Sequence, residues 1–185
     1  DYPPTTPVDD RVIETMLACL GREANFGNPA SSGHFYGQAA RELVEQARKQ
    51  VAQRVGAQPD DLVWTSGATE SNNLALKGVA QGGGKPGHLI TSLLEHKAVL
   101  DTVAELERQG WAVTRLKPDA AGLIQPEAVH QALREDTRLV SLMAVNNELG
   151  TLTDFAAIGA LVRAHGALLH VDAAHGGGVA VSPTH

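Results

Sequence analysis

The sequence predicts an α/β fold built on a buried, mainly parallel β-sheet. From residue 60 onward, short apolar runs alternate with longer segments of helical period, which is typical of β-α-β units. The 19 glycines fall at the ends of these segments, where glycine favours turns and helix termini.

Five apolar runs are predicted strands because they are short and rich in residues that favour extended backbone. They span residues 62–65, 89–92, 112–116, 139–143 and 167–171. Four helices are expected between them, at about 70–80, 97–109, 126–134 and 154–165.

Residues that favour helix ends support three of these helices. Gly110 and Gly166 stand where a residue of left-handed backbone would end a helix. Pro126 suits a first helical turn, since the amide hydrogen that proline lacks has no intrahelical partner there.

Two further helices are predicted before the sheet. Residues 35–55 carry apolar side chains spaced by four and end at Gly56, which predicts one long amphipathic helix. A shorter helix is expected from Asp10 to Leu20, with Asp9 or Asp10 as its cap. We expect one domain over 1–185, with a helical segment at 1–56 and a β-α-β core at 57–185.

Composition excludes several classes of function. With 15 basic and 21 acidic residues the net charge is -6, so we expect no nucleic-acid partner. The longest apolar runs fall short of the roughly 18 residues of a membrane helix, so we expect no membrane partner. Cys19 is the single cysteine and so forms no internal disulfide, which agrees with the cytoplasmic, reducing location that we expect. No cysteine and histidine residues are spaced like the ligands of a zinc site, so we expect no bound metal.

Candidate binding residues follow the predicted strands, because ligands of open α/β sheets bind outside the carboxyl ends of the strands. After the run at 62–65, small residues at 66–72 open a helix whose amides and dipole suit an anion such as phosphate. An ordinary strand-to-helix turn explains the same composition equally well.

Three single residues also follow predicted strands. Asp172 is placed to pair with a cationic ring nitrogen, although it suits equally a helix cap or a partner for a backbone amide. Asn147 is able to donate to a phenolic oxygen, but asparagine in such a turn is more often selected for left-handed backbone. His96 is able to stack on an aromatic ligand, or is simply an exposed polar residue.

Together these motifs resemble the pyridoxal-phosphate-dependent cysteine desulfurases of iron-sulfur cluster assembly, in the class V aminotransferase family. The resemblance covers nearly the whole chain in order and spacing. It is carried by the segments 1–9, 26–29, 65–72, 95–100, 145–148 and 170–174.

The resemblance implies the α/β, three-layer α-β-α sandwich of an incomplete large domain of a fold-type I transferase. It implies that the turn at Ala68 and Thr69 holds the phosphate of pyridoxal 5'-phosphate and that His96 stacks on its ring. It also implies that Asn147 lies beside the phenolic oxygen and that Asp172 keeps the ring nitrogen protonated.

Several positions depart from the family pattern. His175 stands where the family has a glutamine beside the phenolic oxygen, and Pro3-Pro4 replaces small residues. The family's Schiff-base lysine, its sulfur-accepting cysteine and its substrate-binding arginine belong to later sequence. No lysine follows Asp172, and Cys19 is interpreted as a small apolar packing residue of the first helix.

The resemblance implies transfer of sulfur from L-cysteine, giving alanine and an enzyme persulfide. Without the lysine and the cysteine we expect this chain to be inactive alone. One alternative is a non-catalytic association module, which pairs as a homodimer or with a complementary C-terminal piece. The others are half of a split enzyme and a fragment of a selenocysteine lyase or aminotransferase.

Overall fold

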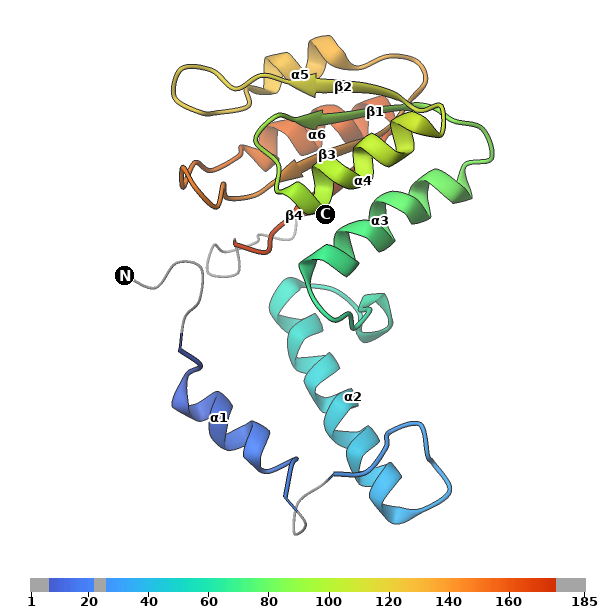
Figure 1. The fold of residues 1–185 in the computed structure, drawn as a ribbon, viewed down its shortest axis with the longest axis vertical. Coiled ribbons are helices and arrows are strands. Elements are labelled where there is room, and N and C mark those ends of the chain that lie inside the picture. Colours follow the sequence, from blue (N-terminus) through green and yellow to red (C-terminus); the bar gives the residue numbers. More distant parts are fainter. Residues whose placement is uncertain (1–6, 22–25, 176–185) are drawn as a thin grey trace. The chain divides into compact units, whose positions relative to one another are not determined.

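The computed structural model describes residues 7–21 and 26–175 of the chain. Its elements run from α1 to β4 in the order shown in Figure 1. The chain divides into two compact units, residues 1–63 and 64–185. The prediction of one domain with a boundary near residue 56 stays a prediction.

The first unit holds two helices and a short 3-10 turn. They are α1 (Asp10–Leu17), α2 (Phe35–Val55) and η1 (Pro59–Asp61). Asp9 caps α1 by accepting a hydrogen bond from the amide of Arg11, as predicted. The helix α2 has the predicted limits and ends at Gly56.

The second unit contains a four-stranded sheet in which every pairing is parallel. Its strands are β1 (His88–Ser92), β2 (Ala112–Leu116), β3 (Thr137–Met143) and β4 (Leu168–Asp172). Their order across the sheet is β2-β1-β3-β4. Four of the five predicted strands are therefore confirmed.

Helices cover both faces of this sheet. They are α3 (Ala68–Gly82), α4 (Lys97–Arg108), α5 (Pro126–Ala132) and α6 (Phe155–His165). In the view of Figure 1, α4 lies in front of the strands and α6 behind them. Pro126 occupies the first turn of α5 and Gly166 ends α6 with a φ of 87°, as predicted.

Alternating side chains of the strands feed two separate apolar cores. Leu89 and Leu139 pack with residues of α3 and α4 in one core. Ile90 and Val140, one position later in each strand, pack with residues of α5 and α6 in the other. The predicted three-layer α-β-α architecture with a mainly parallel sheet is confirmed.

One predicted strand is wrong. Residues 62–65 pair with no strand in the part of the chain that the structure describes, and Val63 and Trp64 are 68% and 48% exposed. The run has the composition of a strand, but a strand also needs a neighbour to complete its backbone hydrogen bonds.

The interpretation of Cys19 as an apolar packing residue is also not supported. The helix α1 stops at Leu17, before the predicted end at Leu20, and none of its residues is buried. Cys19 lies beyond the helix and is only half-buried. The apolar residues expected to pack around it, such as Met16 and Leu20, are largely exposed.

Among the residues that the structure describes, no helix combines the length and the apolar character needed to cross a membrane.

Candidate functional site

The first part of the candidate site is the N-terminal turn of α3. Ala68 and Thr69 are the first two residues of this helix, and both are exposed. The amides of a first helical turn have no intrahelical partner, and the helix dipole adds partial positive charge. This turn therefore suits an anion, and the binding of a phosphate group here stays a prediction.

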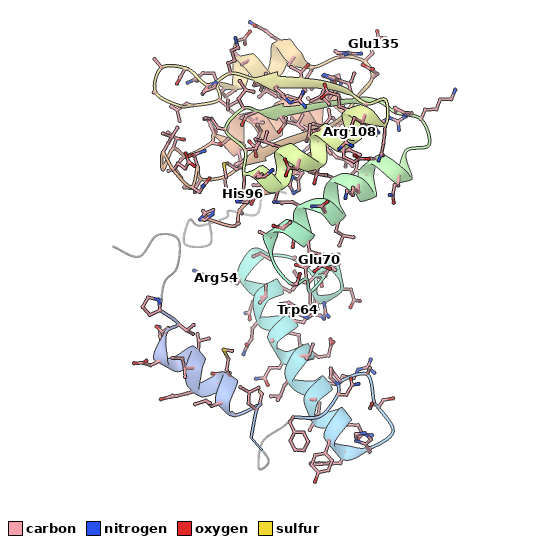
Figure 2. All side chains as sticks on the ribbon, viewed as in Figure 1. Arg54, Trp64, Glu70, His96, Arg108 and Glu135 are labelled. Carbon is pink, nitrogen blue, oxygen red and sulfur yellow. The ribbon has the colours of Figure 1, made fainter. Side chains whose placement is uncertain are left out.

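One carboxylate already uses part of this turn. Glu70, labelled in Figure 2, accepts hydrogen bonds from the amide of Ser66 at 2.7 Å and from its hydroxyl at 2.6 Å. These two bonds hold the pKa of the exposed Glu70 carboxyl below its usual range. The Ser66 amide is therefore engaged, whereas Glu70 leaves the amides of the next residues uncapped.

Gly67 gives the turn its shape. It precedes α3 with a φ of 157° and a ψ of -179°, a conformation that is essentially restricted to glycine. A β-carbon at this position would meet no atom within 4 Å, so the requirement for glycine comes from backbone conformation and not from crowding.

The second part is Asp172, the last residue of β4, which is only 5% exposed. Its Oδ2 accepts a hydrogen bond of 2.8 Å from Nδ2 of Asn72 in α3. Its Oδ1 accepts one of 3.1 Å from the amide of Ala174, so the interpretation as a partner for a backbone amide also holds. Each carboxylate oxygen has two acceptor positions, so Asp172 keeps capacity for a further donor.

Glu95 is a second buried carboxyl near Asp172. It is 6% exposed, and its Oε1 accepts a hydrogen bond of 2.6 Å from the hydroxyl of Ser92. Its Oε2 is buried and has no partner among the described residues. Burial raises the pKa of Glu95 to about 7, against the opposing effect of hydrogen bonds from Ser92 and the Met143 backbone, and the charge of Asp172 adds to the increase.

The third part is His96, which is the N-cap residue of α4 and is exposed (Figure 2). Its Nδ1 accepts a hydrogen bond of 3.2 Å from the amide of Ala98, so the ring caps the helix. With Nδ1 as the acceptor, a neutral ring carries its proton on Nε2. The cap fixes the start of α4 and leaves the faces of the ring available.

The fourth part is the loop that follows β3. Asn147 is exposed, whereas its neighbour Asn146 is 7% exposed and carries the hydrogen bonds of the loop. Positive φ among the described residues occurs only at glycines, so left-handed backbone does not explain Asn147. The loop instead uses Gly150, with a φ of 71°.

Hydrogen bonds bring these parts together in pairs. Asn72 connects Asp172 to the helix that begins with Ala68 and Thr69. Asn146 donates to the carbonyl of Leu94, which connects the loop of Asn147 to the turn before His96. His175 is exposed near the end of the described residues, and no hydrogen bond or ion pair within the described part of the chain joins it to the other candidates. Pro3 and Pro4 lie outside the described residues.

Asn72, Glu95 and Asn146 are not among the predicted site residues. All three are polar residues next to the predicted strand ends or helix start, which is the available signal. Their burial depends on contacts between distant segments: 100 residues separate Asn72 from Asp172, and 52 separate Asn146 from Leu94.

The arrangement offers four chemical functions at one end of the sheet. It has uncapped amides for an anion, a buried carboxylate for a cationic donor, an imidazole with free faces, and an exposed amide side chain. These groups suit a flat, phosphorylated heteroaromatic ligand with a protonated ring nitrogen.

Comparisons with known proteins agree on one family. Residues 1–179 match the family described as Aminotransferase class-V. Cysteine desulfurase IscS of Azotobacter vinelandii is 60% identical over 179 residues, which are 96% of this chain and 44% of that protein. The corresponding protein of Pseudomonas syringae pv. tomato is 59% identical over 179 residues, which again are 96% of this chain and 44% of that protein. The chain thus spans less than half the length of these relatives.

Solved protein structures are also similar to this chain. The structure described as SspA in complex with cysteine superposes with a TM-score of 0.87 at 42% identity, covering 92% of this chain and 49% of that one. DndA from Streptomyces lividans superposes with a TM-score of 0.84 at 48% identity, covering 95% and 49%.

Proposed function

We propose that this chain, which belongs to the aminotransferase class-V family, supplies the ring-holding part of a pyridoxal 5'-phosphate site in a cysteine desulfurase. The observation that carries the proposal is the buried carboxylate of Asp172, held at the end of β4 by Asn72 of α3. Such a carboxylate is a suitable partner for a protonated ring nitrogen, and pyridoxal phosphate, when bound, supplies an electron sink for carbanion chemistry.

Each candidate residue has a separate role in this proposal. The amides at Ala68 and Thr69 bind the phosphate, and His96 stacks against the ring. Asn147 and His175 donate to the phenolic oxygen, so His175 takes the place of an uncharged glutamine. Asp172 holds a proton at the ring nitrogen because its negative charge stabilises the protonated form.

The residues present fit the cofactor. Asp172 has unused acceptor capacity, although its two oxygens already receive bonds from Asn72 and Ala174. Glu70 is the one described group at the helix start that opposes a phosphate, because its carboxylate occupies the Ser66 amide. Glu70 is exposed, so it is free to turn toward solvent when an anion binds.

L-cysteine as substrate, a persulfide as product and iron-sulfur cluster assembly as the use of that sulfur are part of the same proposal. A cytoplasmic location stays a prediction. The chain contains five lysines, and none of them follows Asp172. They are Lys49, Lys77, Lys85, Lys97 and Lys117.

Cofactor binding tests the proposal directly. We expect the chain to bind pyridoxal phosphate in an absorbance or circular-dichroism titration, and Asp172→Ala to weaken binding at least ~10-fold. Asp136→Asn is the control, because it alters an exposed acid paired with Arg134. Equal affinity of the wild-type chain and Asp172→Ala would show that Asp172 does not hold the ring.

Covalent capture tests the lysines. Borohydride reduction of the loaded chain, followed by mass spectrometry, is expected to find no pyridoxyl group on any of the five lysines. A pyridoxyl-modified lysine, whichever it is, would show that this chain supplies its own covalent anchor.

Association is a second candidate function, favoured by the exposed apolar side chains of α1. Ile13, Met16 and Leu17 are 41%, 54% and 61% exposed. Sedimentation of the chain alone and mixed with the C-terminal part of a relative tests this. A heterocomplex with desulfurase activity supports a split enzyme, whereas a monomer in every mixture excludes association.

A further inference from the structure

The loops that carry His96 and Asn147 follow neighbouring strands. His96 comes four residues after the end of β1, and Asn147 comes four residues after the end of β3. The two strands pair in parallel, so their carboxyl ends lie side by side. Two exposed loops on separate strands have no fixed spacing unless a contact joins them.

Asn146 makes that contact with its side-chain amide. Its Nδ2 donates to the carbonyl oxygen of Leu94 at 2.9 Å and lies 3.4 Å from Sδ of Met143. The bond to Leu94 crosses from the loop after β3 to the turn after β1. Asn146 is 7% exposed, so water does not readily replace this bond.

The other end of the Asn146 side chain shapes its own loop. Its Oδ1 accepts hydrogen bonds from the amides of Glu148 at 3.0 Å and Leu149 at 2.8 Å. Its backbone carbonyl accepts from the amide of Gly150 at 2.9 Å. These bonds close the loop around Asn147 and leave the Asn147 side chain exposed.

The turn before His96 is fixed from its own side as well. The Oγ of Ser92 accepts from the amide of Leu94 at 3.1 Å and donates to Oε1 of Glu95 at 2.6 Å. Glu95 and Asn146 also line one small pocket of about 10 Å³, together with residues 122–124 of the loop that follows β2. That volume holds one water at most.

We propose that Asn146 is a positioning residue that couples the His96 turn to the Asn147 loop and so sets the spacing of the two groups. The relevance of that spacing to a ring-shaped cofactor rests on the proposed function. The coupling itself is a property of the ligand-free chain.

The substitution Asn146→Ser separates the two roles of the side chain. A serine hydroxyl accepts from the amide two residues later, as asparagine does in a turn, but it is too short to reach the Leu94 carbonyl. Asn146→Ala removes both roles. Ile158→Val is the control for stability, since Ile158 is fully buried in the apolar core and its side chain carries no hydrogen-bonding group.

The first measurement uses the ligand-free chain. We expect NMR signals of Leu94, Glu95 and the His96 ring to shift in Asn146→Ser and to shift further in Asn146→Ala. They should stay in place in Ile158→Val. Shifts confined to residues 144–151 in Asn146→Ser would overturn the proposal, because they would show that Asn146 acts only on its own loop.

The second measurement is the affinity for pyridoxal phosphate. We expect Asn146→Ser to weaken binding about 10-fold at a temperature where it is as fully folded as Ile158→Val, which should bind like the wild-type chain. If Asn146→Ser and Ile158→Val weakened the binding of pyridoxal phosphate equally, the positioning role would be overturned. If the wild-type chain binds no pyridoxal phosphate, the proposed function fails, and the ligand-free NMR measurement still decides the coupling.

Discussion

Asn72 donates a hydrogen bond of 2.8 Å to Asp172, and both side chains are at least 95% buried. The bond joins helix α3 to the last strand of the sheet across 100 residues of sequence. It gives a buried carboxylate one of the donors that it needs away from water.

Removing this donor is expected to destabilise the chain. Asn72→Ala leaves Asp172 short of a hydrogen bond, so the free energy of unfolding should fall by about 2 kcal/mol in urea denaturation. Asn73→Ala is the matched control in the same helix, because the Asn73 side chain makes only an exposed bond to the carbonyl of Thr69. Equal losses in the two variants would contradict a special role for the Asn72 bond.

Glu95 is expected to make stability fall as the pH rises. Its pKa is about 7 in the folded chain and near 4.5 when unfolded, so the folded chain binds more protons between these values. The stabilisation that comes from the protonated Glu95 is complete below about pH 4.5 and is lost as the pH rises through 7. The loss is at most about 3 kcal/mol. Urea denaturation from pH 5 to 8 should show this slope in the wild-type chain and a flatter one in Glu95→Gln.

His88 is expected to make stability fall as the pH falls, which is opposite to the effect of Glu95. Its ring nitrogens lie 2.8 Å from the hydroxyls of Thr137 and Thr114, and burial lowers its pKa below 6.5. The folded chain then binds fewer protons than the unfolded chain, so stability is lost as the pH falls below about 6.5. His88→Gln should remove this loss in acid denaturation. A variant as acid-sensitive as the wild-type chain would exclude His88 as the cause.

Gly67 is expected to tolerate no side chain. Gly67→Ala forces alanine into a conformation essentially restricted to glycine, so the free energy of unfolding should fall by roughly 1–3 kcal/mol. Gly78→Ala in the middle of α3 is the control, because its β-carbon would meet no atom within 4 Å. That substitution should stabilise the chain by about 0.5–1 kcal/mol. Circular dichroism during urea unfolding measures both, and a neutral Gly67→Ala would show that the turn adapts.

The fold was predictable where local chemistry decides it. Pro126, Gly166 and Asp9 mark helix ends through interactions with nearby backbone, and all three predictions are confirmed. The strand predicted at 62–65 is not confirmed, because the formation of a strand depends on a neighbouring strand as well as on composition.

The candidate site was predictable only in part. The positions of Asp172 and His96 follow from strand ends, which the alternation of segments indicates. The bonds of Asn72 and Asn146 could not be predicted, since each depends on how a helix or loop packs against a distant segment. Their neighbours Asn73 and Asn147, identical in type, are exposed or partly exposed.

The order of the strands has a consequence for folding. The strand β4 is last in the described sequence and pairs only with β3 within the sheet. The contact between Asp172 and Asn72 closes a loop of 100 residues, so it costs more chain entropy than a local contact and is of the kind that slows folding. A chain interrupted during synthesis before β4 would contain Asn72 of α3 without Asp172, the carboxylate to which it donates.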